Sequence, residues 1–194
     1  MDNKRLIIGV YILFIACFVI AWIFSASNFQ SAFAGMQASS NSTAIPDSGA
    51  LELFIHNASS GIMVYLASVF FAIPAVVMIA YDGVNMGLIG PLFNTILPNG
   101  GMFFIIYLIP HGIFEITASV IQSACGILLF LFIFRFVKAL LGSETSGMSG
   151  AFEKTKKPLI QSLVLLGFSI VLMLIAAPIE AYFSVPFAEF IMGV

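Results

Sequence analysis

Long apolar runs alternate with short polar segments along this chain. A helix rises about 1.5 Å per residue, so about 20 apolar residues cross a hydrocarbon core of roughly 30 Å. Four runs have about this length, and they cover residues 6–24, 62–81, 116–134 and 159–179. Each predicts a transmembrane helix, and Pro74 is expected to kink the second or to pack against a neighbour.

Residues 83–115 form the least regular part of the chain. They are mostly apolar but rich in Gly and Pro, so no uninterrupted helix of membrane-spanning length fits. Irregular backbone is tolerated in lipid only where protein or a water-filled cavity satisfies it. We therefore expect one broken or re-entrant crossing, with helices near 84–97 and 102–109 and a break at 98–101.

These elements predict an all-α polytopic membrane protein of about five transmembrane helices, with the third one broken. The whole chain, residues 1–194, is then a single membrane domain. A polar stretch at 25–56 and another at 139–157 are the two main loops. The segment from residue 183 to the C-terminus is expected to lie at the membrane interface.

Charge supports this class and orients it. Only 8% of the residues are charged, against about 25% in a soluble domain. The cations form one cluster at the N-terminus and one near the second loop, and they are Lys4, Arg5, Arg135, Lys138, Lys154, Lys156 and Lys157. The positive-inside rule predicts a plasma-membrane protein with both clusters and the N-terminus in the cytoplasm, and with loop 25–56 and the C-terminus outside.

Several function classes find no support in the sequence. The net charge of −2 excludes a nucleic-acid binder, and the two cysteines lie inside apolar runs, which excludes a thiolate metal site. The HExxH, GxSxG and Walker A motifs do not occur. We therefore expect no enzymatic activity and no cofactor. The expected partners are the lipid bilayer and other membrane or envelope proteins, and faces of small residues would permit a homodimer.

A few ionisable groups lie in or beside the apolar runs, where they are costly and become functional candidates. Five polar side chains are predicted to converge near the extracytoplasmic side, and they are His111, Glu115, Glu180, His56 and Asn57. His111 and Glu115 share one helix face, together with Ser119, Gln122 and Gly126. Two alternatives stay open, a structural polar lock between helices or a hydrated crevice that carries protons.

Two further site predictions follow from the same spans. A metal site at His111, Glu115 and Glu180 is not expected, because zinc prefers more His or Cys ligands. Asp82 is placed at the cytoplasmic end of the second span, level with Arg135, so an Asp82–Arg135 pair is predicted there.

One motif resembles a known family. The run Ile106-Tyr-Leu-Ile-Pro-His-Gly-Ile-Phe-Glu-Ile116 resembles the signature of the stage II sporulation protein M family. Three other pieces fit in order, and they are Phe54-Ile-His-Asn57, Asp82-Gly83-Val-Asn-Met-Gly87 and Ala176-Ala-Pro-Ile-Glu180-Ala-Tyr-Phe. The resemblance covers residues 5–190 or so. It implies a small membrane protein of about five helices.

The resemblance also carries an expected role. In spore-forming bacteria a family member works in engulfment, in a complex with peptidoglycan-remodelling proteins, and related proteins occur in organisms that make no spores. The matching positions are Asn57, Gly83, Gly87, His111, Gly112, Glu115 and Glu180, with the three glycines expected to matter for the backbone.

Two functions therefore remain. The first is a non-enzymatic subunit or scaffold of a membrane complex. The second is a channel or proton-coupled transporter that uses His111, Glu115 and Glu180. A dry contact between Glu180 and the polar helix face that begins at His111 would favour the scaffold. A water-filled crevice between them would favour transport.

Overall fold

The computed structural model describes residues 3–27, 49–95, 97–142 and 147–193. Almost all of these residues are helical, and this part of the chain contains no strand. The predicted all-α class is confirmed. Most of the polar stretch 25–56, namely residues 28–48, lies outside the described residues, whereas residues 50–56 belong to a helix.

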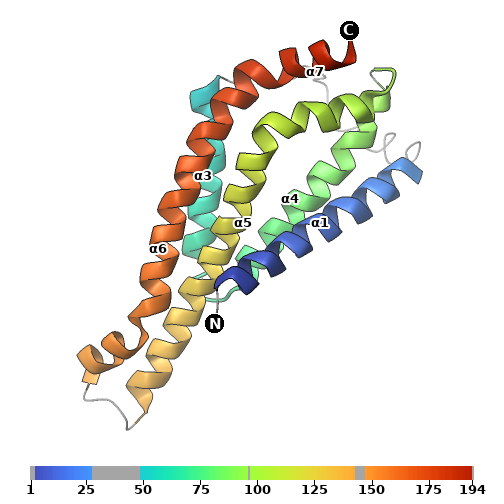
Figure 1. Cartoon of the computed structure of the whole chain (residues 1–194). Coiled ribbons are helices and arrows are strands. Elements are labelled where there is room, and N and C mark those ends of the chain that lie inside the picture. The colour runs from blue at the N-terminus through green and yellow to red at the C-terminus, as the bar shows by residue number, and fades with distance from the viewer. Residues whose placement is uncertain (1–2, 28–48, 96, 143–146, 194) are drawn as a thin grey trace.

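Five helices run along the bundle in alternating directions (Figure 1). They are α1 (Asn3–Ser27), α3 (Ala50–Ala67), α4 (Ile73–Leu92), α5 (Gly100–Leu141) and α6 (Gly147–Ile179). A π-helical turn, η2 (Glu180–Ser184), then leads into α7 (Val185–Met192), which lies across one end of the bundle. The C-terminus lies at the end of the bundle that carries α7, whereas α1 begins away from that end and well short of the far parts of α5 and α6.

Within the described part of the chain, four segments are long and apolar enough to cross a membrane: α1, α4, α5 and the continuous stretch Gly147–Met192. Many large apolar side chains on their outer faces are exposed, as expected for contact with lipid. The protein is therefore an integral membrane protein. The fifth helix, α3, carries polar side chains such as His56 and Asn57, and it packs against α5, α6 and α4.

The predicted second span, 62–81, is wrong. Helix α3 ends at Ala67, the chain reverses through residues 68–72, and α4 begins at Ile73. Pro74 does not kink a helix but occupies the first turn of α4, where its missing N–H is not needed. The turn carries exposed Phe70 and Phe71 and contains no charged residue, Gly or Pro, so little marks it in the sequence.

The single broken crossing predicted for residues 83–115 is also wrong. This segment contains the end of α4, the short 3-10 turn η1 (Phe93–Thr95) and the start of α5. The break near residues 98–101 exists, but it separates two antiparallel helices. Asn94 stabilises the connection by accepting a hydrogen bond from the Gly101 N–H at 2.8 Å, and Asn99 adopts a left-handed φ of 58°. The described residues still form five helices along the bundle, because the turn at 68–72 divides the predicted second span between α3 and α4.

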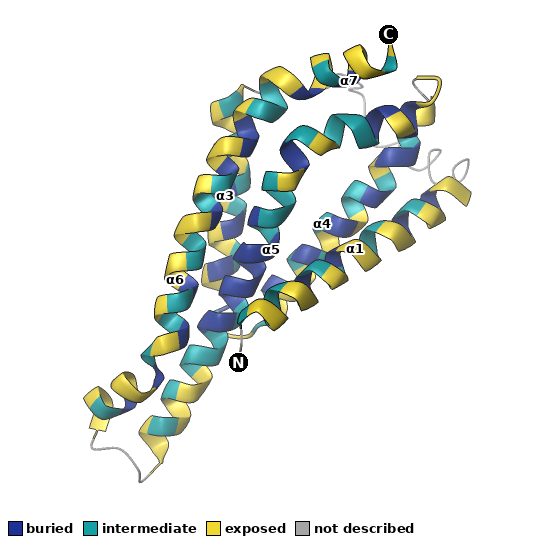
Figure 2. Ribbon diagram, viewed as in Figure 1, coloured by how far each residue is buried: buried dark blue, intermediate teal, exposed yellow. Residues whose placement is uncertain are grey.

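Helix α5 is the central element. Its 42 residues give it a length of roughly 63 Å along its axis. The helix bends (Figure 1), and it contains Pro110. Its most extensive contact is with α6, and it also packs on α1, α3, α4 and α7. Buried residues concentrate along its middle part (Figure 2). Most of the predicted loop 139–157 is helical, because α5 ends at Leu141 and α6 begins at Gly147.

Helices α1 and α4 form the second extensive contact, and glycines allow their close approach. Gly83, Gly87 and Gly90 face α1. A Cβ added at Gly83 would lie 2.7 Å from the carbonyl oxygen of Phe14, and one added at Gly87 would collide with that of Phe18. Small residues of this spacing let helix backbones pack directly in a bilayer.

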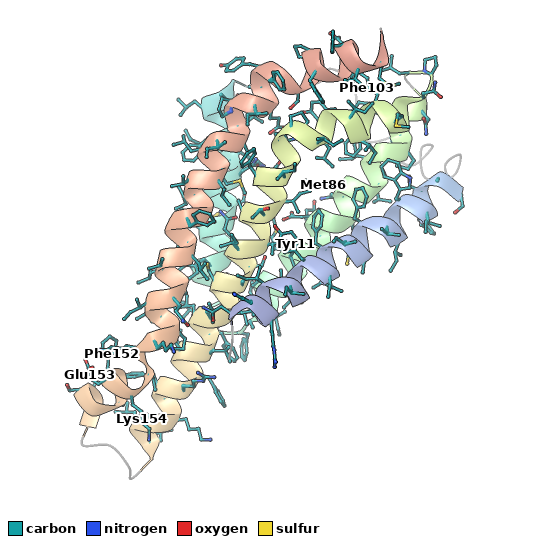
Figure 3. All side chains as sticks on the ribbon, viewed as in Figure 1. Tyr11, Met86, Phe103, Phe152, Glu153 and Lys154 are labelled. Atoms are coloured by element: carbon teal, nitrogen blue, oxygen red, sulfur yellow. The ribbon has the colours of Figure 1, made fainter. Side chains whose placement is uncertain are left out.

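The described cations gather at one part of the molecule. They lie at the start of α1, the end of α5 and the start of α6. Lys154 and its neighbours Phe152 and Glu153 lie on the first turns of α6, far from α7 (Figure 3). This arrangement agrees with the positive-inside argument, and the orientation itself stays a prediction.

Replacing Gly87 with Ala should destabilise the protein by about 1–3 kcal/mol, because the added Cβ forces α1 and α4 apart. Thermal unfolding in detergent measures the effect. The matched control is Gly167→Ala on α6, where a Cβ meets nothing within 4 Å. The control should be neutral or slightly stabilising. Equal destabilisation by the two variants would contradict the close α1–α4 contact.

The turn at residues 68–72 should be accessible from the side of the membrane that holds the N-terminus. A single cysteine at Phe70, in a Cys17→Ala, Cys125→Ala background, should react with a membrane-impermeant thiol reagent from that side. A reporter at the C-terminus should respond from the opposite side. Labelling of residue 70 from the side of the C-terminus would refute this topology.

Candidate functional site

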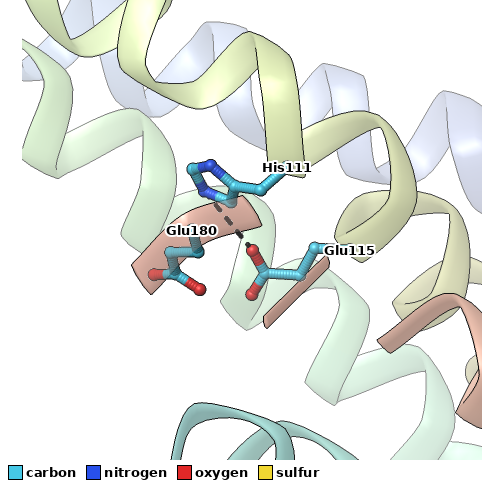
Figure 4. Close-up of side chains that lie close together, drawn as sticks. All are labelled: His111, Glu115 and Glu180. Atoms are coloured by element: carbon cyan, nitrogen blue, oxygen red, sulfur yellow. Dashed lines mark ion pairs between the residues drawn. The ribbon is translucent and has the colours of Figure 1, made fainter. Parts of the chain in front are cut away.

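Three ionisable side chains converge where α5 meets η2. His111 and Glu115 lie one turn apart on the same face of α5, and Glu180 comes from η2. One potential ligand atom from each lies within 4.8 Å of the others. The Nε2 atom of His111 is 3.7 Å from Oε2 of Glu115 (Figure 4). The His111 side chain is 3% exposed and that of Glu115 16%, so the cluster is shielded inside the protein.

Hydrogen bonds from a second layer of residues hold the cluster. The Ser184 hydroxyl lies 2.8 Å from Nδ1 of His111 and donates to the carbonyl oxygen of Ile179 at 3.1 Å. The Tyr107 hydroxyl lies 3.4 Å from Oε1 of Glu180 and donates to it. The Tyr107 ring also meets the His111 ring edge to face, with centroids 5.0 Å apart. The π-helical turn places both Glu180 and Ser184 against α5, and such turns recur at functional sites.

Asn57 connects this cluster to α3. Its Nδ2 atom donates a hydrogen bond of 3.2 Å to Oε1 of Glu115. Glu115 therefore faces Asn57 with one carboxylate oxygen and His111 with the other. The side-chain contacts of the cluster therefore connect α3, α5 and η2.

A polar cavity of about 310 Å³ adjoins the cluster between α3, α4, α5 and α6. Its polar lining includes His56, Asn57, Asp82, Asn85, Glu115 and Gln122. Among its described lining residues there is no Lys or Arg. The lining extends from the exposed His56 and Tyr81 to the buried Gln122 and Ser123, so the cavity leads inward from the surface.

Gln122 lies at the buried part of this cavity. The residue is 4% exposed, and its Nε2 atom has no hydrogen-bond partner among the described residues. Its amide lies directly against Gly61, where any added Cβ would overlap it. A buried donor without a partner costs about 1–3 kcal/mol. Such a donor is explained when a water or a solute occupies the cavity.

The predicted Asp82–Arg135 pair is wrong. Because α4 begins at Ile73, Asp82 lies in the middle of that helix and lines the same cavity as Glu115. Arg135 instead lines a smaller pocket, of about 180 Å³, together with Asn3 and Lys154. The error follows directly from the misplaced second span.

The structure brings the five other predicted site residues together. His111, Glu115 and Glu180 form the cluster, Asn57 bonds to it, and His56 lines the adjoining cavity. Gly83 and Gly87 lie in the α1–α4 contact, whereas a Cβ at Gly112 would meet only the Leu108 and Ile116 side chains of its own helix.

Sequence reasoning missed Tyr107, Ser184 and Asn85. Tyr107 lies four residues before His111, and Ser184 lies four residues after Glu180. Extending the polar face of each helix by one turn would have identified Tyr107 and Ser184. Asn85 lies three residues after Asp82, so it would have followed from a correct placement of α4.

Comparison with known families gives one clear result. The family model described as stage II sporulation protein M matches residues 10–185, which is most of the chain and includes every residue of the cluster. Comparisons with curated proteins and with solved structures gave no match. The predicted resemblance is confirmed, and the chain belongs to the stage II sporulation protein M family.

Proposed function

We propose that this integral membrane protein is not an enzyme but binds a small cation, or a proton, in its polar cavity and conducts it. The observation that carries the proposal is the meeting of Asp82 from α4 and Glu115 from α5 in one cavity without a described Lys or Arg. The cavity thus offers negative charge. Its amide and hydroxyl groups complete a lining that suits a hydrated cation or a proton.

The cost of placing these acids supports a functional role. Carboxylates within apolar helices are expensive, and they mark ion or proton pathways in membrane proteins. The chain has no Lys or Arg between Arg5 and Arg135, so no cation on α3, α4 or the first turns of α5 can neutralise them. A mobile cation or a proton would perform that neutralisation.

The position of Glu115 supports a path that leads from the surface through the cavity to the cluster. Glu115 lines the cavity with Asp82 and contacts His111 outside the cavity lining. The surface opening near His56 and Tyr81, the cavity and the cluster are therefore contiguous. A proton that enters the cavity reaches His111 through Glu115.

Replacing Asp82 with Asn should abolish or strongly reduce flux, by at least tenfold, because it removes charge from the cavity while keeping the side-chain volume. Proteoliposomes loaded with a pH-sensitive dye, and with K⁺ and Na⁺ gradients, measure this flux. The control is Glu189→Gln on α7, an exposed carboxylate that is not among the residues lining the cavity. Absence of flux in the wild type, or equal flux in Asp82→Asn, would contradict the proposal.

A second candidate function is a subunit of a membrane complex, and a different surface favours it. An almost entirely apolar groove of about 480 Å³ lies between α1 and α5 and is lined by residues that include Phe14, Phe18, Ile109 and Ile113. A transmembrane helix of a partner protein fits this description, since bilayer helices associate by close packing. The implied role of a family member in an engulfment complex agrees with this candidate.

A photoreactive amino acid at Ile113 should cross-link to a partner protein in the native membrane if the groove holds a helix. The control position is Val164 on α6, which is also exposed but does not line the groove. Cross-links confined to Ile113 would support the subunit function, and lipid adducts at both positions would contradict it.

A further inference from the structure

The hydrogen bonds around His111 are compatible with a proton on Nδ1. The carbonyl oxygen of Ile179 can only accept, and the Ser184 hydroxyl lies 3.1 Å from it. When the hydroxyl donates there, its oxygen accepts from Nδ1 of His111. In that tautomer of the neutral imidazole the other nitrogen, Nε2, presents a lone pair toward Glu115.

The two carboxylates present acceptors to the same point. Oε1 of Glu115 accepts from Asn57, and Oε2 of Glu115 faces the His111 ring. Oε1 of Glu180 accepts from the Tyr107 hydroxyl. With Nε2 unprotonated and both carboxyls ionised, three acceptors lie within 4.8 Å of one another in a partly shielded site. Such an arrangement is repulsive unless a proton or a metal cation lies between them.

No side-chain cation can fill this position from nearby sequence. The chain carries no Lys or Arg between Arg5 and Arg135 and none after Lys157. The cations that it does have lie at the start of α1, the end of α5 and the start of α6, whereas the cluster lies beside α7. A positive charge between the three groups would therefore come from outside the chain, as a proton or as a metal ion.

We propose that His111, Glu115 and Glu180 bind a divalent first-row transition metal ion such as Zn²⁺ or Mn²⁺. One imidazole and two carboxylates are ligands that these ions accept, and two carboxylates balance the charge of a divalent ion. His111 and Glu115 also have the i, i+4 spacing that places two ligands on one helix face. The sequence alone argued against this site because it offers one His and no Cys, but it did not reveal how closely Glu180 approaches.

The surrounding hydrogen bonds form the second layer that metal sites require. Ser184, Asn57 and Tyr107 each bond to a different ligand and hold it in position. Ligand atoms around such an ion lie roughly 3 Å apart, since each bond is about 2.0–2.2 Å long. The side chains therefore need to close by about 1–2 Å to hold an ion. Because Glu115 also lines the cavity, an ion can reach the site from there.

The test is metal binding by the full-length protein in lipid nanodiscs. After treatment with a chelator, Zn²⁺ or Mn²⁺ is added, and bound metal is counted by elemental mass spectrometry. We expect about one ion per chain. Affinity should fall at least tenfold in His111→Gln and Glu180→Gln, and ten- to a hundredfold in the second-layer variant Ser184→Ala. The matched control for the Glu variant, Glu189→Gln on the exposed face of α7, should bind as the wild type does.

A wild-type measurement removes the dependence on variants that fail to fold. Adding Zn²⁺ or Mn²⁺ should raise the melting temperature of the wild type, and the chelator should reverse this. No bound ion and no thermal shift in the wild type, or equal binding in a folded Glu180→Gln variant, would overturn the proposal and leave a proton or water in the cluster. The proposal does not depend on transport, because Asp82→Asn should lose flux and keep the metal.

Discussion

Acidic side chains in an apolar layer, without basic ones to match, are the constraint on which the rest of this structure depends. Asp82, Glu115 and Glu180 all lie on segments long and apolar enough to cross a membrane. In such surroundings a carboxylate needs hydrogen-bond donors, water or a bound cation. The protein supplies donors to Glu115 and Glu180 from α3 and α5 and leaves a polar cavity beside them. The helix arrangement is thus organised around the neutralisation of these groups.

The sequence predicted the helices well and their ends poorly, for a physical reason. Apolar runs identify segments that prefer lipid, but they contain no signal for a turn that is itself apolar. The turn at residues 68–72 carries Phe70 and Phe71 where a soluble protein would have polar residues. The run 62–81 was therefore predicted as one span, although it is divided between α3 and α4. The predicted position of Asp82 was wrong for the same reason.

The site was more predictable than the fold around it. The i, i+4 spacing of His111 and Glu115, and the expected depth of Glu180, were enough to predict that these residues lie close together. The directions of the hydrogen bonds were not predictable, because they depend on Ser184 meeting His111 across a distance of 73 residues in sequence. Those directions distinguish three converging acceptors from an ordinary hydrogen-bonded network.

The π-helical turn has a consequence for how the site communicates with the surface. A π-turn widens the helix by one residue per turn, so it sets the rotation of everything that follows. Ser184, the last residue of η2, contacts His111, and α7 begins at the next residue. The direction in which α7 leaves the bundle is therefore set one residue after the contact with the imidazole.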